Sequence, residues 1–124
     1  MDDLIAWKND AGKKKALVIK GMRQIGKTFI VKAFAEENYE NVVYINFKDN
    51  ESAKKIFDGD FVINRITLDI SALFPGTHFV PGKTIVIFDE VQECANARAS
   101  IKAFMLDGRY DVICTGSLLG IKGY

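Results

Sequence analysis

The segment GMRQIGKT carries the first residues whose types and spacing could do chemistry. It matches the pattern GxxxxGK[ST], in which the glycines let the backbone approach phosphate oxygens closely. Successive backbone N–H groups and the positive end of the following helix would then face the anion. We predict a phosphate-binding loop whose nucleotide contacts come from Gly21, Met22, Arg23, Gln24, Ile25, Gly26, Lys27, Thr28 and Phe29.

Two side chains of this loop are expected to have specific roles. Lys27 would reach the β and γ phosphates, and the Thr28 hydroxyl would bind Mg²⁺. Arg23 could contact the nucleotide or a neighbouring subunit, and an exposed arginine is the other interpretation. For the whole segment, the competing interpretation is a glycine-rich turn that opens a helix and binds nothing.

A second group consists of two carboxylates, Asp89 and Glu90, that directly follow the apolar run IVIF. Asp89 could hold the Mg²⁺ shell, while Glu90 could orient or deprotonate an attacking water. Alone, this pattern is weak, because acidic residues often follow a buried strand. Together with the upstream loop it predicts the second half of a nucleotide site, with Thr28 and Asp89 as metal ligands and Lys27 and Glu90 as catalytic residues.

Two hydroxyls form a third group after the last apolar run. Thr115 and Ser117 would look at the γ phosphate if this run is a strand beside the first one, and we count both as candidate catalytic residues that sense it. The alternative is that these hydroxyls only cap the turn that follows.

The elements that must position these residues alternate along the chain. Short apolar runs predict strands over 16–19, 42–47, 84–88 and 111–114, and helical spacing of apolar residues predicts helices over 27–38, 51–57, 61–74 and 96–107. Such alternation predicts an α/β fold, a parallel-sheet P-loop core with ligands at the carboxyl ends of the strands. The expected buried helix faces are Ile30, Val31, Ala33 and Phe34; Val62, Ile66, Ile70 and Leu73; and Ala97, Ile101, Phe104 and Met105.

Composition limits the class of protein. A chain of 124 residues with 48% hydrophobic residues is expected to be one globular domain over 1–124. The net charge of +1 gives no overall attraction to nucleic acid or acidic lipid. No apolar run approaches the roughly 20 residues that span a bilayer, so we expect a cytoplasmic protein without a membrane partner. Cys94 and Cys114 are expected to be free thiols, since metal-ligand spacing is absent from the sequence.

The segments GMRQIGKT, VVYINF, TIVIFDEVQEC and ICTGSLLG together resemble a family of prokaryotic AAA-type ATPases that carry a further, poorly characterised domain after the ATPase core. The resemblance extends over about 4–122. It implies that Lys27 and Thr28 match the family's phosphate and Mg²⁺ residues, that Asp89 and Glu90 match its second acidic motif, and that a γ-phosphate sensor falls at Thr115 or Ser117. Ala95 departs from the family, which more often carries proline there.

The function implied by the resemblance is ATP binding and Mg²⁺-dependent hydrolysis, with ATP and Mg²⁺ as cofactors. Two alternatives stay open: a nucleotide-binding interaction switch with little or no hydrolysis, and a P-loop small-molecule kinase. The family would continue with a fifth strand, an arginine-finger region and a lid, so we expect an N-terminal fragment that is inactive alone and has an open edge on its first strand. A homo-oligomer remains open, and the sequence does not identify a protein partner.

Overall fold

The computed structural model describes the backbone of residues 16–19 and 25–116 and the side chains of residues 29–116. Four strands form a parallel sheet in the order β1-β4-β3-β2. They are β1 (Ala16–Ile19), β2 (Asn41–Asn46), β3 (Thr84–Asp89) and β4 (Asp111–Thr115). The α/β class and the position of the fourth strand beside the first are therefore as the sequence predicts. Within the described residues, β1 and β2 are the edges of the sheet.

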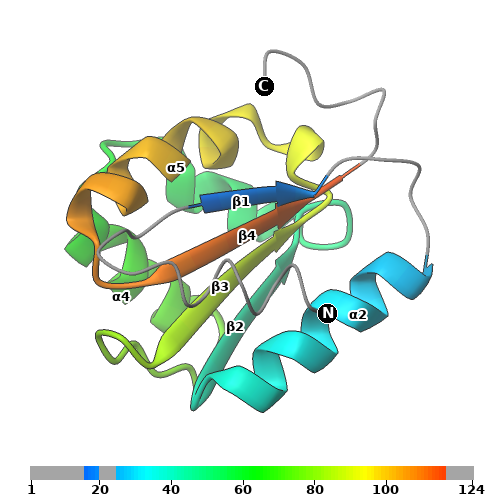
Figure 1. The fold of residues 1–124 in the computed structure, drawn as a ribbon. Helices are drawn as coiled ribbons and strands as arrows, with labels where there is room; N and C mark the ends of the chain where they lie inside the picture. Colours follow the sequence, from blue (N-terminus) through cyan, green and yellow to red (C-terminus); the bar gives the residue numbers. More distant parts are fainter. Residues whose placement is uncertain (1–15, 20–24, 117–124) are drawn as a thin grey trace.

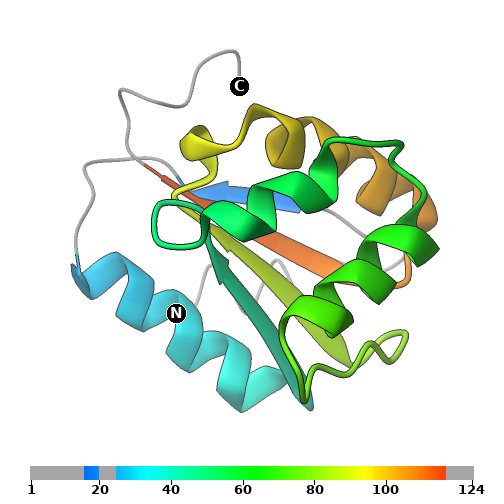
Figure 2. The ribbon, with the colours of Figure 1, turned by 180° about the vertical axis from the view of Figure 1, so that it is seen from behind.

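Helices cover both faces of the sheet, which explains why β3 is buried along its whole length. Figure 1 shows α2 (Ile25–Asn38) on one face, and Figure 2 shows α4 (Ile63–Leu73) and α5 (Ala95–Asp107) on the other. Short helical segments complete the second face and the carboxyl edge: α3 (Glu51–Lys54), η1 (Lys55–Phe57) and η2 (Val91–Glu93). No helix in the described part of the chain is both long enough and apolar enough to cross a membrane.

Alternation along the strands divides the core into two layers. On the α2 face, Val31, Phe34 and Ala35 pack against Ile85, Ile87 and Ile113. On the other face, Phe88 contacts Phe47, Phe57 and Phe104 with ring centroids 5.5, 5.5 and 5.9 Å apart. Edge-to-face contacts of this kind stabilise the fold beyond the contribution from burying the rings. They fix the end of β3, immediately before Asp89, against η1, α5 and the residue that follows β2.

The element boundaries differ from the predicted ones mainly at helix starts. The helix predicted over 27–38 begins at Ile25, and the one predicted over 61–74 is shorter, from Ile63 to Leu73. The helix predicted over 51–57 is only one turn of α-helix followed by the 3-10 turn η1. Gly108 ends α5 in the left-handed conformation, with φ 75°, as a glycine at this position predicts.

Four residues predicted to lie on buried helix faces are instead exposed. They are Ile30, Val62, Leu73 and Met105. For Ile30 and Met105 the physical reason is helix phase, since a step of one residue turns the side chain by about 100°. Leu73 is in phase with Ile66 and Ile70 but is the last residue of α4. The buried sets are Val31, Phe34 and Ala35 on α2, Ile63, Ile66 and Ile70 on α4, and Ala97, Ser100, Ile101 and Phe104 on α5. Val62 precedes the first residue of α4, so it is outside the helix altogether.

Candidate functional site

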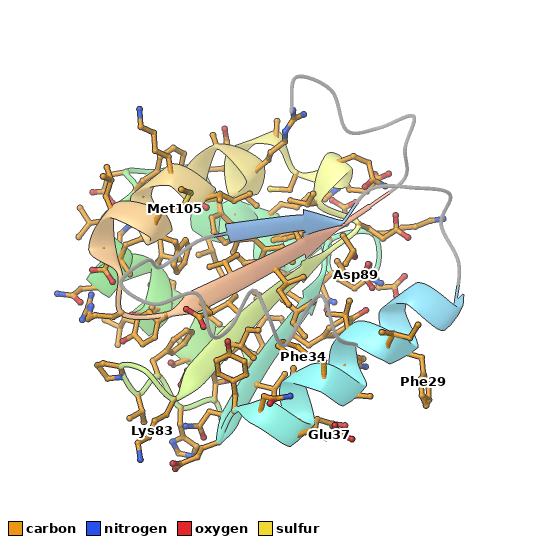
Figure 3. The ribbon with its side chains drawn as sticks, viewed as in Figure 1. Phe29, Phe34, Glu37, Lys83, Asp89 and Met105 are labelled. Carbon is orange, nitrogen blue, oxygen red and sulfur yellow. The ribbon has the colours of Figure 1, made fainter. Side chains whose placement is uncertain are left out.

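The register of the sheet brings three polar side chains to one face of its carboxyl edge. Asn46 pairs with Asp89, and Phe88 pairs with Cys114, so β2, β3 and β4 end at nearly the same level. Alternation then puts Tyr44, Asp89 and Thr115 on the face that α2 covers, together with Ile85, Ile87 and Ile113. Figure 3 shows Asp89 at the end of β3 on the side of α2.

Asp89 is 6% exposed and, within the described residues, accepts hydrogen bonds from three donors. Its Oδ1 accepts from the Thr115 hydroxyl and, at 2.9 Å, from the backbone N–H of Glu90. Its Oδ2 accepts from the Tyr44 hydroxyl. Donors on both oxygens restrain rotation of the carboxylate, so its orientation is set by β2 and β4 as well as by β3.

The Tyr44 hydroxyl stays protonated in this environment. Burial, and then the hydrogen bond to Asp89, raise the pKa of Tyr44 well above its ordinary value. The Nζ of Lys32, on α2, lies 4.1 Å from the centroid of the Tyr44 ring. The side chain of Asn46 donates a long hydrogen bond of 3.5 Å to the same hydroxyl and closes the turn after β2 by accepting from Lys48 N at 2.9 Å.

Glu90 adopts a left-handed backbone conformation, with φ 54° and ψ 46°. Among the described non-glycine residues, no other has a positive φ. This conformation costs a residue with a Cβ about 1–2 kcal/mol, and such strain is concentrated at functional sites. The side chain is 5% exposed, and its Oε1 accepts from Gln92 Nε2 at 2.6 Å. The turn therefore directs Glu90 out of the strand and holds its carboxylate against Gln92.

The phosphate-loop residues are only partly within the described structure. Gly21, Met22, Arg23 and Gln24 lie outside it, and so does Ser117. Ile25, Gly26, Lys27 and Thr28 form the first turn of α2, so the helix begins two residues before the predicted start at Lys27; their side chains lie outside the described residues. Phe29 is 67% exposed and points away from the sheet (Figure 3). Any contact of Phe29 with a nucleotide at the sheet edge would therefore be through its backbone.

Two functional candidates were missed by the sequence reasoning, namely Tyr44 and Gln92. Tyr44 lies in the strand predicted over 42–47, where the sequence analysis assigns it no role. A tyrosine at a half-buried strand position nevertheless signals a hydroxyl that needs a hydrogen-bond partner. Gln92 lies in the segment TIVIFDEVQEC, in which the sequence alone assigns no chemical role to this position. A polar residue two positions after a buried glutamate was the available signal.

The donor set at the edge suits a hard cation such as Mg²⁺. Mg²⁺ is bound through one or two carboxylates plus water and substrate phosphates rather than by a closed protein cage. Asp89 supplies one carboxylate, and no group of three or more His, Cys, Asp or Glu in the described part of the chain could hold a metal by itself. Cys94 and Cys114 are free and buried, and burial raises the pKa of both thiols, so they are unsuited to metal binding or redox chemistry.

The chain matches one family of known proteins over most of its length. A family model described as an AAA domain matches residues 13–122. Among solved structures, the chain is similar to C. elegans PCH-2, with 19% sequence identity and a TM-score of 0.47. The similarity covers 87% of this chain and only 30% of the PCH-2 chain. A search of curated proteins finds no match.

Proposed function

This chain belongs to the AAA domain family, a family of nucleotide-binding cores of the ATPase type, and from that membership we propose that it binds ATP with Mg²⁺ and hydrolyses it. The observation that carries the proposal is the arrangement of three side chains at the carboxyl edge of the sheet: Asp89 ends β3, Glu90 follows it, and Thr115 ends β4. This edge faces the start of α2, where the phosphate-loop sequence ends. In open parallel sheets, ligands bind at this edge.

Each residue of the site has a distinct proposed role. The loop from Gly21 to Thr28 and the N-terminus of α2 would bind the phosphates through backbone N–H groups, with Lys27 on the β and γ phosphates. Thr28 and Asp89 would hold Mg²⁺, which, when bound, neutralises charge that develops on the phosphates. Glu90 would orient and deprotonate the attacking water, with its carboxylate held by Gln92.

A nucleotide-binding switch with little hydrolysis is the second candidate, and one observation favours it. Glu90 is almost completely buried, and the short hydrogen bond from Gln92 occupies Oε1. A carboxylate held in this way has one oxygen occupied by Gln92 and is less accessible to a water molecule until Gln92 releases it. Measured phosphate release separates the two functions, because only the hydrolase turns over.

The proposal is tested with Lys27→Ala and Glu90→Gln. Lys27→Ala should weaken ATP binding by about ten- to a hundredfold or more, because a charge-assisted contact with the phosphates is lost. Glu90→Gln should keep ATP binding but lower turnover by about 10² to 10⁴, because an amide cannot accept a proton. Calorimetric titration with ATP and Mg²⁺ measures the first effect. Phosphate release by the protein measures the second.

Each result has a clear contrary outcome. Unchanged ATP affinity in Lys27→Ala would refute the phosphate-loop assignment. Turnover near the wild-type rate in Glu90→Gln would make Glu90 a structural residue. Tight binding by wild type with no phosphate release would favour the switch.

A further inference from the structure

We infer that Tyr44 is a positioning residue that orients Asp89 and fixes its distance from α2, and thereby sets how strongly Mg²⁺ enhances nucleotide binding. This inference rests on the proposed function, because it concerns the same nucleotide site. It begins with the position of Tyr44 in the sheet. Tyr44 pairs with Ile87 and Asn46 pairs with Asp89, so Tyr44 and Asp89 are diagonal neighbours on the same face. A long side chain can bridge such a diagonal.

The Tyr44 hydroxyl contacts Asp89 at a different oxygen from Thr115 and Glu90. Thr115 and the Glu90 N–H both donate to Oδ1 of Asp89, whereas Tyr44 donates to Oδ2. The two oxygens rotate together about the bond between Cβ and the carboxyl carbon, so a donor on each side of the carboxylate resists this rotation from two directions. The hydroxyl of Tyr44 therefore contributes to the orientation of the carboxylate from β2.

The Tyr44 ring connects Asp89 to α2. Lys32 lies over this ring at 4.1 Å and belongs to the same helix as the phosphate loop's last residues. Residues four apart lie on the same side of a helix, so Lys32 stands one turn beyond Thr28, the proposed metal hydroxyl. The contacts from Lys32 to Tyr44 and from Tyr44 to Asp89 thus join the two sides of the proposed Mg²⁺ site, one on α2 and one on β3.

Mg²⁺ is sensitive to such positioning because it demands near-octahedral geometry with ligands at about 2.0–2.1 Å. Loss of the Tyr44 hydroxyl should therefore reduce the metal-dependent part of ATP affinity and spare the part that comes from the loop alone. The measured quantity is the ratio of the ATP dissociation constant in EDTA to that in excess Mg²⁺. For Tyr44→Phe we expect this ratio to fall about tenfold, which corresponds to about 1.4 kcal/mol, at the lower end for a hydrogen bond to a charged group.

Tyr39→Phe is a matched control within the same chain. The Tyr39 hydroxyl also donates to a buried carboxylate on the α2 face, Oδ2 of Asp111, but at the amino end of β4. Both variants lose one phenol hydroxyl that is bonded to one aspartate. Only Tyr44→Phe is at the nucleotide edge, so Tyr39→Phe should leave the Mg²⁺ ratio unchanged.

Lys32→Met is a second variant that keeps the inference testable if Tyr44→Phe does not fold. Lys32 is exposed, so its substitution spares the core, and methionine keeps an apolar stem over the ring while removing the cation. The Mg²⁺ ratio should fall by about threefold, as expected for an exposed cation–π contact. Lys32→Arg keeps the cation and should retain the wild-type ratio.

Titration calorimetry of the 124-residue chain with ATP, in EDTA and in excess Mg²⁺, decides the question, with circular dichroism to verify that each variant is folded. A lower ratio in Tyr44→Phe and Lys32→Met but not in Tyr39→Phe supports the inference. An unchanged ratio in folded Tyr44→Phe would overturn it, and so would an equal fall in Tyr39→Phe, because the effect would then be general loosening. Wild-type protein that binds no ATP, or binds it equally with and without Mg²⁺, would refute the proposed function itself.

Discussion

Replacing Tyr39 by phenylalanine should lower the free energy of unfolding by about 2 kcal/mol, because hydrogen bonds to charged groups contribute roughly 1.5–3 kcal/mol. The Tyr39 hydroxyl donates to Asp111, 72 positions later in the sequence, and both residues are buried. Tyr39 directly follows α2, and Asp111 begins β4, so this bond fastens the helix to the centre of the sheet. Because both residues are buried, a water molecule has poor access and should not replace the lost hydroxyl, while phenylalanine fits the same space.

Urea denaturation measures the loss, with an unchanged slope of free energy against denaturant as evidence that folding stays two-state. For a chain of this size, 2 kcal/mol corresponds to a fall in Tm of about 6–10 °C. Tyr110→Phe is the control, because Tyr110 is also buried but makes no hydrogen bond through its hydroxyl within the described part of the chain. It should change stability by less than about 0.5 kcal/mol. Equal effects of the two substitutions would refute the reasoning that the bond to Asp111 matters.

Two further predictions concern stability. Burial, followed by the hydrogen bond to Asp111, raises the pKa of Tyr39 above its ordinary value of about 10. The contribution of Tyr39 to the free energy of unfolding is therefore fully present below about pH 10. It falls at higher pH, where the unfolded chain releases a proton that the folded chain keeps. The free energy of unfolding of Tyr39→Phe should therefore decrease less steeply with rising pH than that of wild type. Gly108→Ala should lower the free energy of unfolding by about 1 kcal/mol, measured by heat or urea, because φ is 75° at this position. Gly59→Ala is the control and should be nearly neutral, because an added Cβ would make only an ordinary contact with Arg65.

The arrangement of the sheet was predictable because its signals are local and redundant. The four strands are apolar runs, and parallel pairing follows from the helices between them. Once β4 lies beside β1 and β3, the carboxyl ends of β3 and β4 meet, so the proximity of Asp89 and Thr115 follows from topology. Helix faces were less predictable, since Ile30 and Met105 each lie one position from a buried residue. A shift of one residue in the assumed phase exposes a different side chain.

The contacts around the acidic pair could not be predicted, because they depend on register and backbone conformation. Alternation puts Tyr44 on one face of β2, but only the pairing of Asn46 with Asp89 brings its hydroxyl to a carboxylate. The positive φ of Glu90 is equally hidden, because a residue other than glycine gives little sign of it in the sequence. Without that turn, the contact between Gln92 and Glu90 would not be expected either.

The role of Thr115 follows from the fact that a hydroxyl has one proton to donate. In the structure, Thr115 donates that proton to Oδ1 of Asp89. Phosphate oxygens only accept, so Thr115 cannot sense a γ phosphate and hold Asp89 at the same time. A sensor role for Thr115 would break its hydrogen bond to the proposed metal ligand at the moment when the metal is needed. The folded chain therefore favours Thr115 as a residue that positions Asp89, and the predicted γ-phosphate contact then falls to Ser117, which lies outside the described residues.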